Sequence, residues 1–162
     1  MEKPIIRFEN NIKMKVIYLR FRGSYIEFRK HSKSMYEKLL DYAVKKGFYQ
    51  EGKNMVMTIY HDNPFITKSK DLRTSVAMSV NDDISDVDDD EITLMNIEGK
   101  YAVGRFEIKL TEYGEAWNYM YHEWLFKSDS IPRDTFPFEM YVTRPPKNYK
   151  DTSTTDICIP IE

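Results

Sequence analysis

Glu139 is the residue of this sequence best placed to do chemistry, because it is a carboxylate inside the apolar segment FPFEMYV. Side chains alternate between the two faces of a strand, so Glu139 and Tyr141 are expected on one face and the immediate neighbours of Glu139 on the other. A carboxylate beside tyrosines in an apolar setting is unfavourable unless it is paired or faces a ligand. Glu139 is therefore a candidate ligand-binding group. The alternatives are an exposed strand glutamate or one held by Arg20 or Arg105.

Aromatic side chains form the second class of candidates. Aromatic residues make up 14% of the chain, with 12 tyrosines, which is enough to line a cavity as well as to fill a core. Trp117 is expected one turn into a helix, where its ring can form the wall of a ligand cleft, and ordinary core packing is the alternative. Tyrosine combines a flat apolar body with a polar tip. The further wall candidates are Tyr25, Tyr60, Tyr113 and Tyr141.

The sequence matches none of the common catalytic or cofactor templates. His122 and Glu123 are not followed by a second histidine at the spacing of a helical zinc site, and the three histidines are dispersed along the chain. There is no glycine-rich phosphate loop and no GxSxG nucleophile elbow. His61 and Asp62, before Asn63 and Pro64, are interpreted as a strand end and a turn. No metal and no cofactor are therefore predicted.

The elements that position these candidates follow from hydrophobic periodicity. A helix is predicted between Ser24, which forms a capping box with Glu27, and Gly47 at its end. Its apolar face is predicted to comprise Phe28, Met35, Leu39, Leu40 and Ala43. A second helix over 112–127 carries a stripe of Tyr113, Trp117, Met120, Tyr121, Trp124 and Leu125. Strands are predicted over 4–9, 13–22, 54–61, 72–80, 100–108, 137–143 and 155–161.

The two halves of the chain resemble each other. A shift of 85 aligns Ile12, Lys15, Arg20, Phe21, Glu27, Met35 and Tyr36 with identical residues, and a shift of 81 aligns Tyr60, Pro64 and Thr74 with Tyr141, Pro145 and Thr155. At these offsets Thr58 aligns with Glu139, and Ser32 with Trp117. We therefore expect an α+β fold from a tandem β-α-β-β duplication. Its antiparallel sheet would have two helices on one face and a ligand cleft between pseudo-symmetric halves.

The chain is expected to form a single domain, 1–162, with repeat one at about 4–80 and repeat two at about 93–162. The segment 81–92 between them contains seven acidic residues and no basic residue. It lacks the glycine and the final glutamate of a calcium-binding loop, so a solvated acidic loop is predicted.

Composition limits the partners and the compartment. The net charge is −2 and the pI about 6.0, which does not indicate a nucleic-acid-binding surface. The first residues, MEKPIIRFENN, contain no long apolar run, and no signal peptide or membrane span is predicted. The single Cys158 excludes an intramolecular disulfide framework and fits a reducing compartment. A cytoplasmic protein is expected.

Five segments carry a resemblance to a known family. They are RFRGSY (Arg20–Tyr25), IYHDNP (Ile59–Pro64), YGEAW (Tyr113–Trp117), FEMYV (Phe138–Val142) and DICIPI (Asp156–Ile161). In this order they resemble the GyrI-like small-molecule-binding domain, which is also the effector-binding domain of BmrR and Rob type transcription regulators. The resemblance covers nearly the whole chain. The sequence departs from the family pattern at Ile108–Leu110, where many members have a G-P-Y-like turn. It also departs in its long acidic loop.

The resemblance implies a cleft with aromatic walls and a central acid that holds bulky hydrophobic or cationic compounds, as in multidrug binding. Carried over by position, the acid would be Glu139, and Trp117 and Tyr141 would be wall residues, with Tyr25 and Tyr60 as secondary wall candidates. The implied function is drug or toxin sensing or sequestration. No helix-turn-helix flanks the domain, so direct DNA binding is not expected, and a regulatory role would need a separate regulator as partner.

Two other functions stay open. Some GyrI-like proteins resemble hydrolases that open strained, cyclopropane-containing toxins, and here Glu139 would be catalytic by orienting or deprotonating a water. Alternatively, the acidic loop 81–92 would contact a protein partner such as DNA gyrase.

Overall fold

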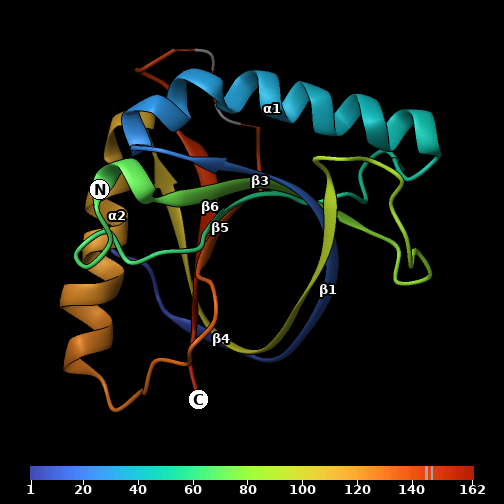
Figure 1. Ribbon diagram of the computed structural model, residues 1–162. Coiled ribbons are helices and arrows are strands. Elements are labelled where there is room, and N and C mark those ends of the chain that lie inside the picture. The colour runs from blue at the N-terminus through green and yellow to red at the C-terminus, as the bar shows by residue number, and fades with distance from the viewer. Residues whose placement is uncertain (145, 147) are drawn as a thin grey trace. The chain divides into compact units, whose positions relative to one another are not determined.

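The computed structural model describes residues 1–144, 146 and 148–162 (Figure 1). These residues form two compact units, of which one comprises Lys13–Glu98 and the other Met1–Ile12 together with Gly99–Glu162. Each unit combines antiparallel strands with helical segments, so the predicted α+β class is confirmed. Pro145, which the repeat aligned with Pro64, lies outside the described residues.

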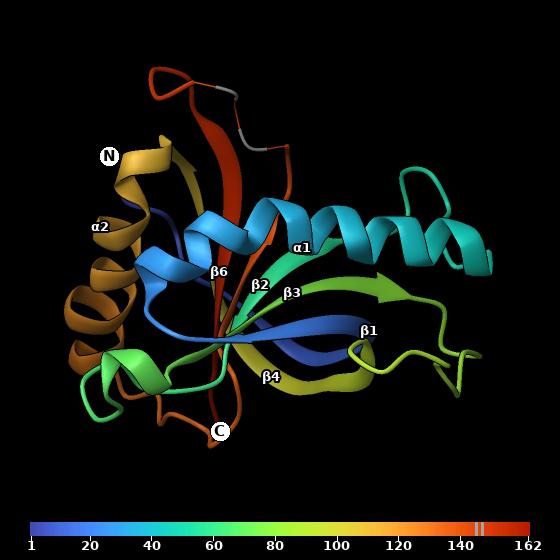
Figure 2. The same cartoon turned by 45° about the horizontal axis from the view of Figure 1, so that its top comes forward.

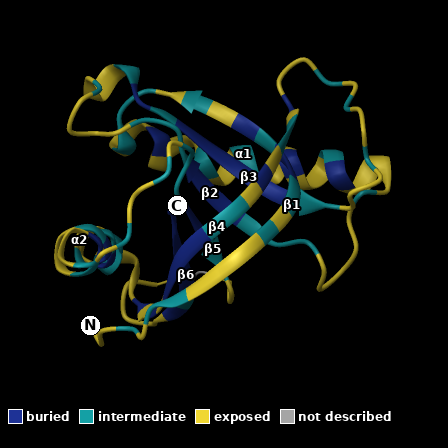
Figure 3. Ribbon diagram, turned by 90° about the horizontal axis from the view of Figure 1, so that it is seen from below, coloured by how far each residue is buried: buried dark blue, intermediate teal, exposed yellow. Residues whose placement is uncertain are grey.

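In the unit Lys13–Glu98, the middle strand β3 (Arg73–Val80) pairs antiparallel with β1 (Arg7–Arg22) and with β2 (Val56–Tyr60). The strand β1 is continuous, so the two separate strands predicted over 4–9 and 13–22 are wrong. The first part of β1 is exposed and rich in polar residues (Figure 3). These residues have a low strand propensity, but an exposed strand tolerates them.

The helix α1 (Tyr25–Lys46) begins and ends where the sequence predicts (Figure 2). Ser24 accepts a hydrogen bond from the backbone N–H of Glu27 at 3.1 Å, and Gly47 ends the helix with a left-handed φ of 74°. The buried residues Phe28, Leu39 and Ala43 pack against the sheet, together with the half-buried Met35. Leu40 is 39% exposed, so its predicted place on the apolar face is wrong. One residue turns a helix by 100°, which takes Leu40 away from the face of Leu39.

In the other unit, β6 (Ser153–Pro160) is the middle strand and pairs antiparallel with β4 (Thr93–Ile108) and β5 (Phe138–Tyr141). The predicted helix over 112–127 is not uniform. It consists of a 3-10 turn (Leu110–Glu112), the α-helix α2 (Tyr113–Asn118), a π-helical segment (Tyr119–Trp124) and a second 3-10 turn (Leu125–Lys127). The predicted apolar stripe is confirmed, because Met120 and Leu125 are buried and its aromatic residues pack against them.

Gly104 on β4 lets α2 and the π-helical segment lie close to the strand. A Cβ atom at this position would lie 2.6 Å from Sδ of Met120 and 3.3 Å from Cδ1 of Ile6. At the offset of 85, the equivalent residue in the other unit is Leu19, which is buried under α1. The side chain of Leu19 is therefore accommodated below α1, whereas a side chain at position 104 would be excluded below α2.

The strand registers of the two units correspond at the offsets found in the sequence. In each unit the middle strand pairs with its two neighbours. Two residues that are paired in one unit correspond to two residues that are paired in the other unit. The pair Thr58–Val76 corresponds to Glu139–Ile157, and the pair Arg20–Ser75 corresponds to Arg105–Asp156.

The acidic segment 81–92 contains no helix or strand and is mostly exposed, and polar contacts together with the buried Ile92 attach it to the unit. Asp88 accepts hydrogen bonds from the Tyr42 hydroxyl at 2.9 Å and from Nζ of Lys46 at 2.6 Å, and Glu91 forms an ion pair with Lys38 at 2.9 Å. No helix among the described residues is long and apolar enough to cross a membrane.

Replacing Asp88 with asparagine is expected to loosen this loop without unfolding the protein. Exposed ion pairs contribute about 1 kcal/mol or less, so the free energy of unfolding should change by no more than that. Amide hydrogen exchange should become faster in 82–90, because local opening loses its strongest contact. The exposed Asp83, whose side chain has no recorded hydrogen bond or ion pair with the described residues, gives a matched control as Asp83→Asn. Equal exchange in both variants would contradict the attachment.

Candidate functional site

Glu139 lies on β5 with 3% of its surface exposed. Its neighbour Phe138 packs edge-to-face on Tyr101, with ring centroids 5.3 Å apart. Because side chains alternate along a strand, Glu139 is expected on the other face of β5. The alternative of an exposed strand glutamate is therefore wrong. Arg105, one of the two arginines considered as partners for Glu139, engages Asp156 instead.

Tyr113, at the start of α2, lies close enough to Glu139 to feel its charge. The Tyr113 hydroxyl is 2.9 Å from Oγ1 of Thr155, which stands opposite Tyr141 in the register of β5 and β6. Burial raises the pKa of Tyr113, and the nearby Glu139 raises it further, whereas the hydrogen bond with Thr155 acts in the opposite direction. Tyr113 is therefore neutral at physiological pH and presents a hydroxyl beside a buried carboxylate.

Trp117 follows Tyr113 by one helical turn, so both rings lie on the same side of α2. The indole of Trp117 stacks on Tyr121, with ring centroids 6.1 Å apart and an angle of 19° between the planes. Trp117 and Tyr121 are half-buried and pack against the buried core of their unit. These two rings and Tyr113 form an aromatic row along α2 and its π-helical continuation.

The remaining two predicted residues belong to the unit Lys13–Glu98. Tyr25 and Tyr60 contact each other edge-to-face, with ring centroids 5.7 Å apart. Burial and the charge of Asp62 raise the pKa of Tyr25. The structure thus brings Glu139, Tyr141, Tyr113 and Trp117 together in one unit, and pairs Tyr25 with Tyr60 in the other.

Thr58 is the residue in the other unit that corresponds to Glu139, and it carries a hydroxyl in place of the carboxylate. Its side chain is 2% exposed, and its Oγ1 is 3.1 Å from the Tyr36 hydroxyl, which donates to the carbonyl of Met57 at 2.7 Å. A hydroxyl at this position is satisfied within its own unit. The carboxylate of Glu139 introduces a negative charge at the equivalent place, which is the main chemical difference between the two positions.

Sequence reasoning missed the buried ion pair of Asp156. This carboxylate is 0% exposed, and Arg105 donates to both of its oxygens, from Nε at 2.8 Å and from Nη2 at 3.0 Å. Arg7 adds a third contact at 3.0 Å. The available signal was an aspartate inside the apolar segment DICIPI, whereas its arginine partner depends on the register of β4 and β6, which the sequence analysis did not predict.

His61 was interpreted only as the end of a strand, and it also forms a polar pair with Ser75. Its Nε2 lies 2.7 Å from Oγ of Ser75, and its ring is 6.1 Å from the ring of Tyr18. Burial, followed by the charges of Arg73 and Arg20, lowers the pKa of His61 from 6.5 to about 4. His61 is therefore neutral in the folded protein at physiological pH.

Because the folded protein binds a proton at His61 less readily than the unfolded chain does, acid should destabilise the fold. The contribution of His61 is complete above pH 6.5 and is lost as the pH falls towards 4. The ring is only half-buried, so we expect a loss of roughly 2 kcal/mol in the free energy of unfolding over this range. Urea unfolding at pH 7.5, 5.5 and 4.5 measures it. His61→Gln should flatten this dependence, whereas the exposed His31→Gln should leave it unchanged.

Among residues 1–144, 146 and 148–162, no group of three or more histidine, cysteine or acidic side chains is arranged to hold a metal ion. What the geometry offers is a buried carboxylate, a neutral phenol and a row of aromatic rings. These groups can attract a cation by charge and by its interaction with ring faces, and they can bury apolar surface. A domain of this kind is a small-molecule-binding domain.

The chain belongs to the family of GyrI-like small-molecule-binding domains, whose model matches residues 5–162. This family includes the effector-binding domains of BmrR-type regulators. Comparison with curated protein sequences finds no significant match.

Solved structures share the fold at low sequence identity. The C-terminal domain of EcmrR, from a regulator of the BmrR/MerR type, is 19% identical with a TM-score of 0.73, and the match covers 100% of this chain and 99% of that one. A hydrolase from Listeria innocua is 14% identical with a TM-score of 0.67, covering 99% and 93%. SAV2435 bound to tetraphenylphosphonium is 10% identical with a TM-score of 0.59, covering 100% and 94%.

Proposed function

We propose that this protein binds bulky hydrophobic cations, with Glu139 as the counter-charge and with Trp117, Tyr141 and Tyr113 as aromatic contacts. The observation that carries the proposal is the burial of the Glu139 carboxylate beside Tyr113. A buried carboxylate is poorly screened by water and therefore attracts an opposite charge more strongly than an exposed one, and a lipophilic cation supplies both that charge and apolar surface. The contribution of Tyr25 and Tyr60, and a cleft between the two repeats, stay predictions from the sequence.

Aromatic faces strengthen the attraction for a cation. The negative face of an aromatic ring attracts a positive charge by about 0.5–2 kcal/mol, depending on how much water is excluded. The stacked pair of Trp117 and Tyr121 and the neighbouring Tyr113 offer such faces on one helix. SAV2435, a relative in fold, is bound to tetraphenylphosphonium, a cation surrounded by four phenyl rings. This ligand class therefore suits the chemistry of the candidate site.

A tandem duplication explains why one acid stands where the other copy has a threonine. The equivalent registers of β2 with β3 and of β5 with β6 support this origin. On this origin, one copy carries the neutral hydroxyl of Thr58 and the other carries the carboxylate of Glu139. The protein would act in the cytoplasm as a sequestering protein, or as a sensor in transcription regulation whose DNA-binding partner is a separate protein.

A hydrolase is the second candidate function, because relatives in fold from Listeria innocua are hydrolases. In this case Glu139 would act as a general base without a cofactor. It would accept a proton from a water molecule while the water oxygen attacks a strained, electrophilic ring carbon. The ring opens and its leaving atom takes up a proton, so that the product is the substrate plus one water. This function differs from binding in requiring turnover.

A protein partner such as DNA gyrase is the third candidate, and the exposed acidic loop 81–92 would be the contact surface. Deleting the loop should abolish partner binding and leave small-molecule binding unchanged. The contacts of the loop with Lys38, Tyr42 and Lys46 make it a fixed part of the surface, which suits a specific contact.

Mass spectrometry separates the first two functions. The purified protein is exposed to a library of hydrophobic cations and strained electrophiles. Compounds retained at unchanged mass by the wild type and lost in Glu139→Gln support binding. Compounds released with the mass of one added water, at many turnovers per protein, support the hydrolase. Neither result would favour the protein partner.

A further inference from the structure

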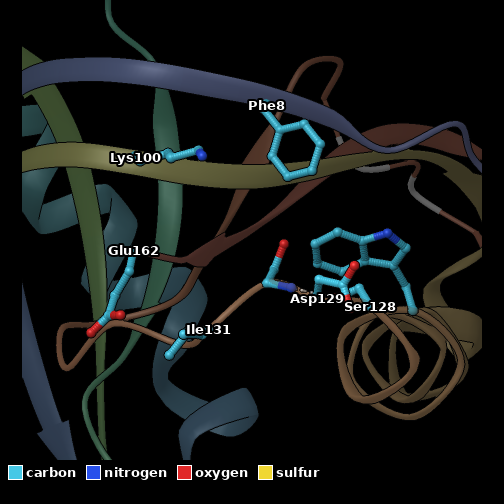
Figure 4. Close-up of a pocket in the computed structure, with 8 residues that line it drawn as sticks. Phe8, Lys100, Ser128, Asp129, Ile131 and Glu162 are labelled. Carbon is cyan, nitrogen blue, oxygen red and sulfur yellow. Dashed lines mark hydrogen bonds between the residues drawn. The ribbon is translucent and has the colours of Figure 1, made fainter.

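A pocket lies in the unit that carries Glu139, and it is formed by residues other than those of the proposed cation site (Figure 4). It has a volume of 390 Å³. Its lining comes from the start of β1, from β4, from the end of the π-helical segment with the loop that follows it, and from the end of the chain. The lining residues are Phe8, Lys100, Trp124, Ser128, Asp129, Ser130, Ile131 and Glu162. None of them belongs to the proposed cation site.

Two aromatic rings and a lysine form one part of this pocket. The rings of Phe8 and Trp124 have centroids 6.1 Å apart and planes inclined at 55°, so together they offer an angled apolar surface. The ammonium of Lys100 lies 5.4 Å from the centroid of Phe8. Within the described part of the chain, Lys100 forms no recorded ion pair with a carboxylate.

Two carboxylates contribute the opposite charge. Asp129 and Glu162 both line the pocket, and neither side chain has a recorded ion pair or hydrogen bond within residues 1–144, 146 and 148–162. Figure 4 shows Lys100 and Phe8 along one side of the pocket, and Asp129, Ile131 and Glu162 along the opposite side. The positive and the negative groups are thus separated across the pocket.

Backbone contacts hold the floor of the pocket in place. The backbone N–H of Glu162 donates to the carbonyl of Ile131 at 2.8 Å, and that of Ser130 donates to Oγ of Ser128 at 3.2 Å. The guanidinium of Arg133 donates to the carbonyl of Lys100 at 3.2 Å. The charged groups therefore extend from backbone segments that are tied to one another, which keeps the cost of ordering them on binding small.

From this arrangement we infer a second ligand site that takes a small zwitterion with one aromatic ring, such as a free aromatic amino acid. The ligand carboxylate would pair with Lys100, its ammonium with Asp129 and Glu162, and its ring would pack against the angled surface formed by Phe8 and Trp124. Only a ligand with both charges offers an opposite charge to the lysine and also to the carboxylates. Ligand pockets run from about 300 to 1,000 Å³, and a volume near the lower end suits a single ring.

The test uses phenylalanine with two singly charged analogues, phenethylamine and 3-phenylpropionate, each titrated into the full-length protein labelled with ¹⁵N. Phenylalanine should shift the backbone amides of Ser128, Ser130 and Glu162, with at least about tenfold higher affinity than either analogue. Lys100→Met retains the apolar stem of the lysine and should reduce phenylalanine binding to the level of phenethylamine. Asp129→Asn combined with Glu162→Gln should reduce it to the level of 3-phenylpropionate.

Glu139→Gln serves as the control, because it should leave phenylalanine binding unchanged whether or not Glu139 binds cations. The inference is overturned if no localised shifts occur up to about 10 mM phenylalanine. It is equally overturned if the three compounds bind alike, or if Lys100→Met has no effect. Tetraphenylphosphonium should not displace phenylalanine, so failure of this site and failure of the proposed function give different results.

Discussion

Glu139→Gln is expected to weaken the binding of tetraphenylphosphonium by at least about 30-fold, and to leave the protein folded. Removing one partner of a buried charge pair costs about 2–5 kcal/mol in binding, and each 1.4 kcal/mol corresponds to a factor of ten in Kd. Glutamine has nearly the same shape as glutamate, so the walls around it should keep their positions. Isothermal titration calorimetry measures the Kd, and thermal unfolding without ligand reports the fold.

The charge itself can be isolated with a ligand of the same shape and opposite sign. Tetraphenylborate presents the same four phenyl rings around a negative centre. The wild type should prefer the phosphonium, and Glu139→Gln should remove most of that preference. Glu115 lies on the same helix as Trp117 but is exposed, so Glu115→Gln removes an equal charge from a place with no proposed role. Equal affinity in wild type and Glu139→Gln would rule out Glu139 as the counter-charge.

The burial of Glu139 and the limits of α1 were predictable because they depend on local patterns. The segment FPFEMYV has the apolar character of a buried strand, and the structure confirms that Glu139 lies on a strand and is buried. Ser24 and Gly47 are local capping signals, and the helix begins after Ser24 and ends before Gly47, as predicted. A short stretch of sequence contains all the physical information that such features need.

Features that depend on the partner element were not predictable in this way. The π-helical segment Tyr119–Trp124 follows no local signal in the sequence, and it occurs where Met120 packs against the bare backbone of Gly104. The ion pair of Arg105 with Asp156 joins residues that are 51 positions apart and requires the register of β4 and β6. The internal repeat transfers a strand register from one copy to the other. It therefore predicts the Arg105–Asp156 pair only if the register within one copy is already known.

Arg105→Met is expected to lower the free energy of unfolding by about 3–5 kcal/mol, the largest effect of any single substitution considered. Asp156 is 0% exposed, and Arg105 supplies two of its three recorded contacts. Arg7 alone would then face the buried carboxylate, with a side chain that is 40% exposed and that is shared with Glu9. Breaking a buried pair from one side is unfavourable because the remaining charge cannot return to water. Urea unfolding at pH 7 measures the loss.

The double variant Arg105→Met with Asp156→Ser distinguishes a stranded charge from lost packing. Serine is the residue that the other unit carries at the equivalent position, Ser75, where it is also fully buried. If the buried carboxylate causes the loss, the double variant should recover most of the stability of the wild type. If the apolar stem of Arg105 were responsible, the double variant would be no more stable than Arg105→Met. We expect recovery, because the Arg105 side chain is 52% exposed and therefore buries little apolar surface, whereas the carboxylate is enclosed on all sides.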